Sequence, residues 1–259
     1  MSSAIEIQDL TVTYSQKPVL WNIGFNLPEG MMAGIIGPNG SGKTTLLKSI
    51  MGLLKPDGGS IKVFGKGLEE VRHRVSYVPQ RESVDWDFPI SVMEVVSMGR
   101  YTRKNLLGKL KKVDKDAALK ALEKVKLLEF KDRQISQLSG GQQQRVFIAR
   151  SLAQEADLYI LDEPFAGVDA ASEEAIFELL SQMKKEGKNV IVVHHDLQSA
   201  AKFFEFIIML NTRLVAAGPT NEVFTEENLE KTYGGQLNIL SRIGDQLKKS
   251  AFPIREKSE

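Results

Sequence analysis

The stretch GPNGSGKTT occupies residues 37–45, directly after the apolar run Met31 to Ile36 and at the start of a helix predicted over Lys43 to Leu54. Its glycines, lysine and threonine have the spacing of a loop that wraps the phosphates of a nucleotide. A glycine-rich turn without a ligand is the alternative, and the strand and helix on either side argue against it. The stretch therefore predicts nucleotide binding at the end of a strand in an α/β sheet.

Within this loop, Gly40 and Gly42 let backbone N–H groups face phosphate oxygens, and the following helix directs its positive end toward them. We expect Lys43 to reach the β- and γ-phosphates and the Thr44 hydroxyl to bind Mg²⁺. GTPases use the same loop, so these residues leave the base of the nucleotide open. The predicted nucleotide contacts are Gly37, Pro38, Asn39, Gly40, Ser41, Gly42, Lys43, Thr44 and Thr45.

Three short apolar runs predict strands that are buried on both faces, at 31–36, Leu158 to Leu161 and Val190 to Val193. Ligands of open α/β sheets bind beyond the carboxyl ends of the strands. The residues that follow the three runs, from Gly37, Asp162 and His194 onward, should therefore converge on one site. Alternating stretches predict additional half-exposed strands near the N-terminus, at Leu10 to Tyr14, Ile61 to Phe64 and Val75 to Val78.

The pattern changes to helical between Trp86 and Gln154. Helices are predicted over Val92 to Met98, Asp114 to Leu127 and Gln142 to Ala153. They suggest a helical lobe inserted into the sheet domain. Beyond about Leu240 the chain is polar and charged, which predicts a poorly ordered tail.

Composition excludes several classes of function. The net charge is +1, so no large basic surface for nucleic acid is indicated. The chain has no Cys, which rules out disulfides and thiolate chemistry, and its three His make a dedicated metal site improbable. No apolar run approaches the ~20 residues that cross a bilayer. We expect a soluble chain whose membrane role, if any, runs through a partner.

The second buried run ends in the acids Asp162 and Glu163. One acid there would be an ordinary solvated strand end or helix cap, but a pair facing a phosphate loop favours catalysis. Asp162 would hold Mg²⁺, directly or through water, and Glu163 would orient or deprotonate the attacking water. After the third run, either His194 or His195 could sense the γ-phosphate. His73 is interpreted as a surface residue.

Together, these motifs resemble the ATP-binding subunit of ABC transporters, over residues 4 to about 235. LSGGQ at 138–142 resembles the family signature, and LYILDEP at 158–164 resembles its second acidic motif. AGVDA at 166–170 is similar to the D-loop, and HHDL at 194–197 to the switch histidine. YVPQ at 77–80 and TVTYSQKPVL at 11–20 match the glutamine between the lobes and the aromatic beside adenine.

The resemblance implies a P-loop NTPase (RecA-like) core with an N-terminal antiparallel β subdomain and an inserted helical subdomain. The ATPase domain would span residues 1–240, with the core at 1–85 and 155–240, the helical subdomain at 86–154, and a tail at 241–259. It also implies ATP with Mg²⁺ as cofactors and Thr44, Gln80 and Asp162 as the metal ligands.

The resemblance gives further residues their expected roles. Tyr14 would stack on adenine, Gln80 and His195 would join Glu163 in catalysis, and Asp169 would pass information between two sites. Two copies would lie head to tail, with the signature of each covering the ATP of the other. A side chain on either signature glycine would block that approach. The signature residues that would contact this ATP are Ser139, Gly140, Gly141 and Gln142.

The stretch RESVDWDFPISVMEVVSMGRY at 81–101 resembles the same region in ATPases of manganese, zinc or iron importers. The expected function is therefore to energise import of a divalent metal, manganese first. Partners would be a permease and, indirectly, an extracytoplasmic metal-binding protein, with the chain peripheral at the cytoplasmic face. Trp86 and Phe88 would either line a groove for a permease helix or belong to the core of the helical lobe.

The main alternative is the ATPase of an exporter, or of an importer for haem, siderophore or cobalamin, because the core motifs would be the same. A DNA-repair clamp would need a long coiled coil between loop and signature. Leu138 follows Lys43 by only 95 positions, and 114–127 offers too few heptads. Translation factors of the superfamily carry two sets of these motifs, whereas this chain has one.

Overall fold

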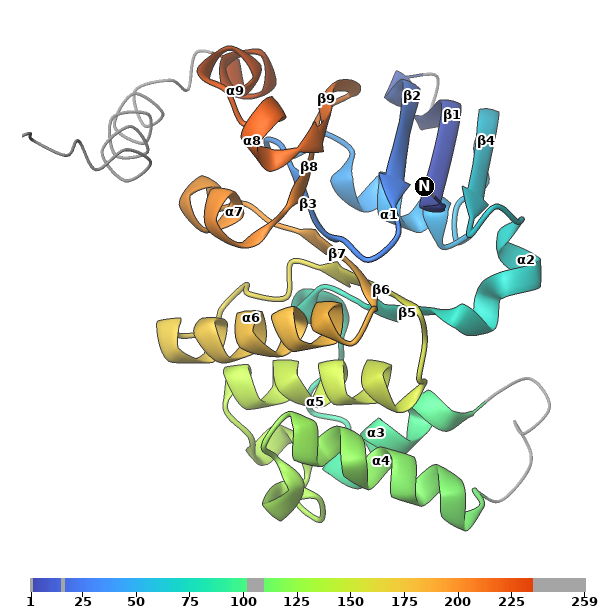
Figure 1. Ribbon diagram of the computed structural model, residues 1–259. Helices are drawn as coiled ribbons and strands as arrows, with labels where there is room; N and C mark the ends of the chain where they lie inside the picture. The colour runs from blue at the N-terminus through green and yellow to red at the C-terminus, as the bar shows by residue number, and fades with distance from the viewer. Residues whose placement is uncertain (1, 15–16, 102–109, 235–259) are drawn as a thin grey trace, which may run out of the picture.

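The computed structural model describes residues 2–14, 17–101 and 110–234, in two sheets and a set of helices (Figure 1). The predicted tail lies outside these residues. The strands are β1 (Ser3–Tyr14), β2 (Lys17–Pro28), β3 (Met32–Ile36), β4 (Gly58–Val63), β5 (Val75–Val78), β6 (Leu158–Asp162), β7 (Asn189–Val193), β8 (Phe206–Asn211) and β9 (Arg213–Pro219). The α-helices are α1 (Lys43–Ile50), α2 (Leu68–Val71), α3 (Val92–Ser97), α4 (Lys112–Lys124), α5 (Gly140–Ala153), α6 (Ala170–Lys185), α7 (Leu197–Phe203), α8 (Thr220–Val223) and α9 (Glu226–Tyr233).

The central sheet has six strands in the order β5-β6-β7-β3-β8-β9. All neighbours pair in parallel except β8 and β9, which are antiparallel. Every residue of β3, β6 and β7 is buried, which confirms the three predicted buried strands. Because β3, β6 and β7 run parallel, the segments that follow them leave the same edge of the sheet.

The second sheet is antiparallel, in the order β2-β1-β4, and contains two of the three predicted half-exposed stretches. The third stretch, Val75 to Val78, is a strand as predicted, but its half-exposure is wrong, because it forms β5 at the edge of the central sheet. Val75, Ser76 and Val78 are buried there, and the Ser76 hydroxyl donates to the carbonyl of Ser151 at 3.4 Å. Ser76, a small polar residue between Val75 and Tyr77, thus resembled an exposed position in the sequence.

Several predicted helix boundaries differ from the structure for local backbone reasons. Helix α1 ends at Ile50 rather than Leu54, because Gly52 adopts φ 63°. Helix α4 ends at Lys124 rather than at Leu127, because Lys126 has φ 55°. Helix α5 begins two residues earlier than predicted, at Gly140, since Ser139 caps it.

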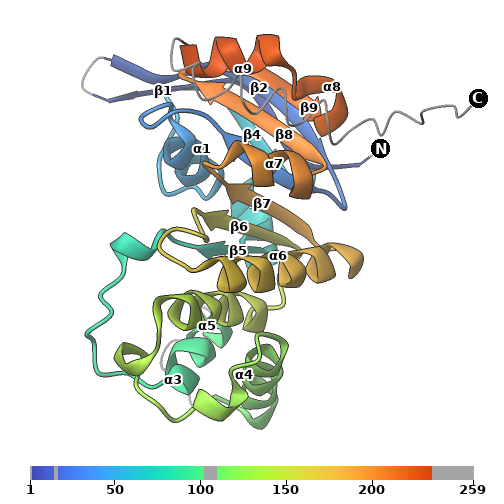
Figure 2. The ribbon, with the colours of Figure 1, turned by 90° about the vertical axis from the view of Figure 1, so that its left-hand side faces the viewer.

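The core is divided by the central sheet into two apolar clusters. In β7, Val190 and Val192 face a cluster that includes helices α3 to α6, while Ile191 and Val193 face one formed with the antiparallel sheet and α1. Helices α3, α4 and α5 lie at one end of the molecule and β1, β2 and β4 toward the other (Figure 2). The limits proposed for the helical subdomain, residues 86 and 154, stay a prediction. Within the described ranges, no helix is both long and apolar enough to span a bilayer.

Candidate functional site

The loop at 37–45 connects β3 to α1 and has the backbone of a cradle. Gly40 and Gly42 adopt φ 79° and 98°, a region that L side chains rarely occupy, and the N–H of Ser41 donates to the carbonyl of Pro38 at 3.1 Å. Helix α1 begins at Lys43 immediately after this turn. Its free N–H groups and its dipole therefore point toward the space that the loop surrounds.

Lys43 places its ammonium group inside this loop. Its Nζ donates to the carbonyls of Gly37 and Pro38, both at 2.9 Å, and the side chain is largely buried. Burial lowers the pKa of Lys43, whereas the nearby carboxylates of Glu163 and Asp162 raise it. A cation with two carbonyl partners in a glycine-rich cradle is suited to binding an anion such as a phosphate.

Thr44 and Asp162 bring two oxygen ligands together across the site. The Thr44 hydroxyl donates to Asp162 Oδ1 at 3.5 Å, and Asp162 is buried at the end of β6. Burial raises the pKa of Asp162, while the Thr44 hydrogen bond opposes that shift. Burial and the neighbouring Asp162 carboxylate raise the pKa of Tyr77 to about 12. A hydroxyl and a carboxylate side by side fit Mg²⁺, which prefers oxygen ligands and keeps several waters.

Glu163 and Gln80 are also in contact at this edge of the sheet. Gln80 Nε2 donates to Glu163 Oε2 at 3.1 Å, which leaves the Gln80 carbonyl oxygen available to a cation. Glu163 has φ 49°, an uncommon backbone conformation for a residue other than glycine. Such strain is typical of residues that a surrounding structure holds in place for function.

The two histidines after β7 have opposite environments. His195 is exposed, whereas His194 is 1% exposed and lies edge-on to Phe165, Phe177 and Phe204, with ring centroids 5.1–5.8 Å apart. Only His195 is therefore accessible to a ligand. His73 is exposed, in agreement with the interpretation of a surface residue.

The signature residues form a second group at the start of α5. Ser139 and Gln142 make a reciprocal cap, in which Ser139 N donates to Gln142 Oε1 at 2.9 Å and Gln142 N to Ser139 Oγ at 3.4 Å. A Cβ on Gly141 would lie 2.3 Å from Ser172 Oγ. Asp169 caps α6, accepting from the backbone N–H and the hydroxyl of Ser172, both at 2.9 Å.

These contacts explain the signature glycines by packing inside one chain, because a side chain at either position would meet a neighbouring residue. This packing was not predicted from the sequence. A Cβ on Gly140 would lie 3.2 Å from the guanidinium carbon of Arg81. Arg81 and Ser172 were missed because neither belongs to a recognisable motif. The position of Arg81 directly after Gln80 was the one available signal.

The aromatic residues that were expected at ligands or partners are found in different settings. Tyr14 is 45% exposed at the end of β1, so its ring is open to a planar ligand. Trp86 is packed, 4.9 Å from the ring of Phe147, and its indole N–H donates to the carbonyl of Arg81 at 2.9 Å. Phe88 is 57% exposed. Trp86 therefore packs in the helical lobe, whereas Phe88 is exposed and its contact with a permease helix stays a prediction.

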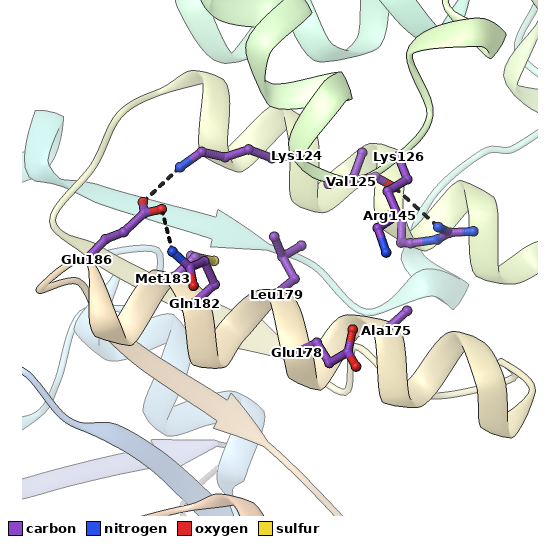
Figure 3. Close-up of a pocket in the computed structure, with 10 residues that line it drawn as sticks. All are labelled: Lys124, Val125, Lys126, Arg145, Ala175, Glu178, Leu179, Gln182, Met183 and Glu186. Carbon is purple, nitrogen blue, oxygen red and sulfur yellow. Dashed lines mark hydrogen bonds and ion pairs between the residues drawn. The ribbon is translucent and has the colours of Figure 1, made fainter.

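Two further hollows lie on the helical side of the molecule. One, of about 320 Å³, lies between the end of α4, α5 and α6, and the Lys124–Glu186 ion pair at 2.8 Å spans it (Figure 3). The other, of about 580 Å³, is an open groove along α3. Its lining combines the apolar or aromatic residues Ile90, Met93, Met98, Tyr101, Leu110 and Leu119 with the polar or charged residues Glu94, Ser97, Lys115, Lys131 and Asp132. In the described residues, no group of three or more His, Cys, Asp or Glu side chains is placed to hold a metal.

Comparison with known proteins finds a family and close relatives. Residues 20–166 match the family described as ABC transporter. The chain is 56% identical to the manganese transport system ATP-binding protein MntB of Bacillus subtilis strain 168, over 91% of this chain and 94% of the relative. It is 52% identical to the zinc transport system ATP-binding protein TroB of Treponema pallidum strain Nichols, over 91% and 88%. Among solved structures, CbiO1 from Clostridium perfringens, part of the ABC transporter complex CbiONQ, is 30% identical with a TM-score of 0.76, over 96% of this chain and 100% of that chain.

Proposed function

This chain belongs to the ABC transporter family, as an ATP-binding subunit that couples ATP hydrolysis to transport, and from this premise we propose that it energises the import of divalent metal ions. The expected fold, a P-loop NTPase core with an antiparallel β subdomain, is confirmed. One observation carries the proposal furthest. Lys43, Thr44, Gln80, Asp162 and Glu163 approach one another at a single edge of the sheet.

The loop at 37–45 would bind the phosphates of ATP through its inward N–H groups and Lys43. Lys43 Nζ already has carbonyl partners at 2.9 Å, so phosphate oxygens would replace or supplement these oxygens rather than desolvate a free ammonium. Tyr14, exposed on β1, would stack on the adenine. Both contacts position the nucleotide before any bond breaks.

Thr44 and Asp162, with the carbonyl oxygen of Gln80, are the residues that would hold Mg²⁺. When bound, this ion would neutralise charge on the phosphates during transfer. Glu163 would take a proton from the attacking water, and the Gln80 amide would keep the Glu163 carboxylate oriented. The exposed His195 would contact the γ-phosphate, whereas the buried His194 would not.

A second copy would complete the site. The first N–H groups of α5 have no carbonyl partner within the helix, and they and the helix dipole would contact the γ-phosphate held by a second copy. ATP would then join two chains, and hydrolysis would release them. Asp169, which fixes the start of α6 beside Gly141, would link the two sites.

A divalent metal is proposed as the cargo because the two relatives described above are named for manganese and zinc transport. Manganese is preferred, since the 56% identity to the manganese relative is the higher of the two. The metal would be carried by a permease and delivered by an extracytoplasmic binding protein. ATPases for metal chelates or for export share the same nucleotide motifs and are the alternative.

The groove along α3 is the proposed contact with the permease. Six of its eleven lining residues are apolar or aromatic, and two of these, Met98 and Tyr101, are exposed large side chains. An amphipathic helix could bury its apolar face there. This contact would hold the chain at the cytoplasmic face of the membrane.

ATP hydrolysis by the purified chain tests the proposal. Glu163→Gln should keep ATP binding, because glutamine has the same shape as glutamate. It should lower the turnover rate by a factor of about 100 or more, because the glutamine amide cannot act as the base. The variant should also accumulate as an ATP-dependent dimer on size-exclusion chromatography. Rapid hydrolysis by Glu163→Gln would refute the assignment of the base.

A further inference from the structure

Arg81 lies where three functional segments of the chain meet. It follows Gln80, and its Nη2 donates to Gln143 Oε1 at 3.0 Å on the signature helix α5. Gln143 is buried, and its own Nε2 donates to the carbonyl of Ile135 at 3.1 Å. The Arg81 guanidinium is thereby tied to a side chain that cannot move independently of α5.

The guanidinium also fills the space that two glycines leave open. An ideal Cβ on Gly140 would lie 3.2–3.3 Å from the guanidinium carbon and both terminal nitrogens of Arg81, and a Cβ on Gly167 would lie 3.3 Å from Nη1. Gly140 starts the signature helix, and Gly167 belongs to the loop before α6. A planar group can lie against both backbones at once, which a tetrahedral ammonium cannot do equally well.

The main chain of Arg81 is also connected to α5, through Trp86. The Trp86 indole donates to the Arg81 carbonyl at 2.9 Å, and the Trp86 ring packs on Phe147 of α5. The guanidinium carbon lies 5.6 Å from the Trp86 ring centroid. Movement of Gln80 therefore reaches α5 through one peptide bond and a constrained arginine.

We infer that Arg81 is a positioning residue that couples the Gln80–Glu163 pair to the orientation of the signature helix. This inference rests on the proposed ATPase function and adds a residue to it. Gln80 contacts Glu163 at one end of the link, and Arg81 contacts Gln143 and Gly140 at the other. Contact of Gln80 with nucleotide or metal would thus change where α5 presents its N-terminus to a second copy.

The test is the substitution Arg81→Lys, which keeps the charge and removes the planar fork. ATP affinity of the purified chain should stay unchanged, since the loop at 37–45 is untouched. The kcat for ATP hydrolysis should fall about tenfold with little change in KM, the size expected for loss of a charged hydrogen bond that aligns the site. In a Glu163→Gln background, the same substitution should weaken ATP-dependent dimerisation by a similar factor.

Two controls separate positioning from general damage. Arg133→Lys makes the same chemical change at an exposed arginine in the helical lobe and should leave kcat, KM and dimerisation unchanged. Gln143→Met removes the acceptor of the Arg81 hydrogen bond. If the two residues act as one link, the double variant should be no slower than the slower single variant.

The outcomes that overturn the inference are distinct from failure of the proposed function. Normal kcat and dimerisation in Arg81→Lys, or independent losses in Arg81→Lys and Gln143→Met, would remove the role of Arg81 alone. A parent chain that neither binds nor hydrolyses ATP would remove the proposed function and this inference with it.

Discussion

At the scale of single residues, the site depends on charges that are held in poorly solvated surroundings. Lys43 and Asp162 are both buried, and burial shifts each pKa toward the neutral form. Each group lies close enough to the other for their charges to oppose that shift. A bound phosphate with Mg²⁺ would place opposite charges beside both groups, so the site is arranged for a ligand that carries both signs.

Replacing Lys43 with alanine should weaken ATP binding severely. The substitution removes the one ammonium that the loop at 37–45 holds in its centre, with carbonyl partners at 2.9 Å. We expect the dissociation constant, measured by equilibrium binding of a fluorescent ATP analogue, to rise at least about a hundredfold, in line with loss of a charged contact in a water-poor site. Lys55→Ala, at an exposed lysine shortly after the same helix, is the matched control. Normal affinity in Lys43→Ala would contradict the role of the loop.

His194 should make the stability of the chain depend on pH. Its Nε2 lies 2.5 Å from Ser199 Oγ, which itself lies 2.5 Å from Asp196 Oδ2. Burial, with a smaller contribution from the charge of His195, lowers the pKa of His194 to about 4. Between the ordinary pKa of about 6.5 and this value, the unfolded chain binds a proton that the folded chain does not.

The free energy of unfolding should therefore fall as the pH falls from about 6.5 to about 4, by up to about 3 kcal/mol from this residue at about 1.4 kcal/mol per pKa unit. His194→Gln, which keeps a donor for Ser199, should remove that part of the pH dependence. Urea unfolding of both proteins across this range gives the difference curve, which cancels the carboxylates they share. Identical curves would mean that His194 is already charged in the folded chain.

At the scale of elements, contacts inside the chain shape the start of α5, in addition to the proposed contact with a second copy. Ser139 and Gln142 close its first turn, and Gly141 packs against Ser172 at the start of α6. The absence of a side chain at Gly141 thus lets α5 and α6 approach closely, in addition to the proposed approach of ATP.

Gly141→Ala should destabilise the folded chain before it affects any dimer. The added Cβ would lie 2.3 Å from Ser172 Oγ and 2.7 Å from Ser172 Cβ, so one helix must shift. Such overpacking costs about 1–3 kcal/mol. Ser172→Gly removes both clashing atoms and should recover part of the loss in the double variant, as measured by urea unfolding. If Gly141→Ala is fully stable yet fails to dimerise, the glycine serves the partner alone.

Some elements could be predicted from the sequence and others could not. The three buried strands and the loop at 37–45 were predictable because their signals are local, an apolar run and a fixed spacing. The contact of Arg81 with Gln143 was not, since it joins residues 62 positions apart through an unremarkable arginine. Likewise, β5 was predicted as a half-exposed strand, because the alternation of residue types does not show that α5 covers the face with Ser76.

At the scale of the whole molecule, the helical end and the sheet meet along α5 and α6, and polar contacts there differ in burial. The Lys124–Glu186 pair joins α4 to the end of α6 across the hollow in Figure 3, with both side chains more than a third exposed. Arg100 instead joins Asp114 and Glu155 inside the helical end, with Asp114 9% exposed. The exposed Lys124–Glu186 pair is easily broken, which would permit the helical end to rotate relative to the sheet.

The two ion pairs should respond differently to removal of the cation. Lys124→Met should change the free energy of unfolding by less than about 1 kcal/mol, because exposed pairs contribute little. Arg100→Met should destabilise the folded chain clearly more than Lys124→Met, because the Arg100 guanidinium donates to the Asp114 carboxylate, the Ala153 carbonyl and the Glu155 carboxylate, at 2.7–3.2 Å. Chemical denaturation of both variants checks the contrast. Equal losses in the free energy of unfolding would show that the Lys124–Glu186 pair stabilises the fold as much as the contacts of Arg100.

The most direct measurement of the central claim is the metal content of cells whose native copy is replaced by Glu163→Gln, grown with limiting manganese, zinc or iron in turn. We expect a selective loss of one metal, manganese first, because the variant would bind ATP without driving the permease. The Arg133→Lys copy should restore normal content. Normal levels of all three metals in the Glu163→Gln cells would contradict import of a free divalent metal. A metal chelate as the cargo, or export as the direction of transport, would then remain.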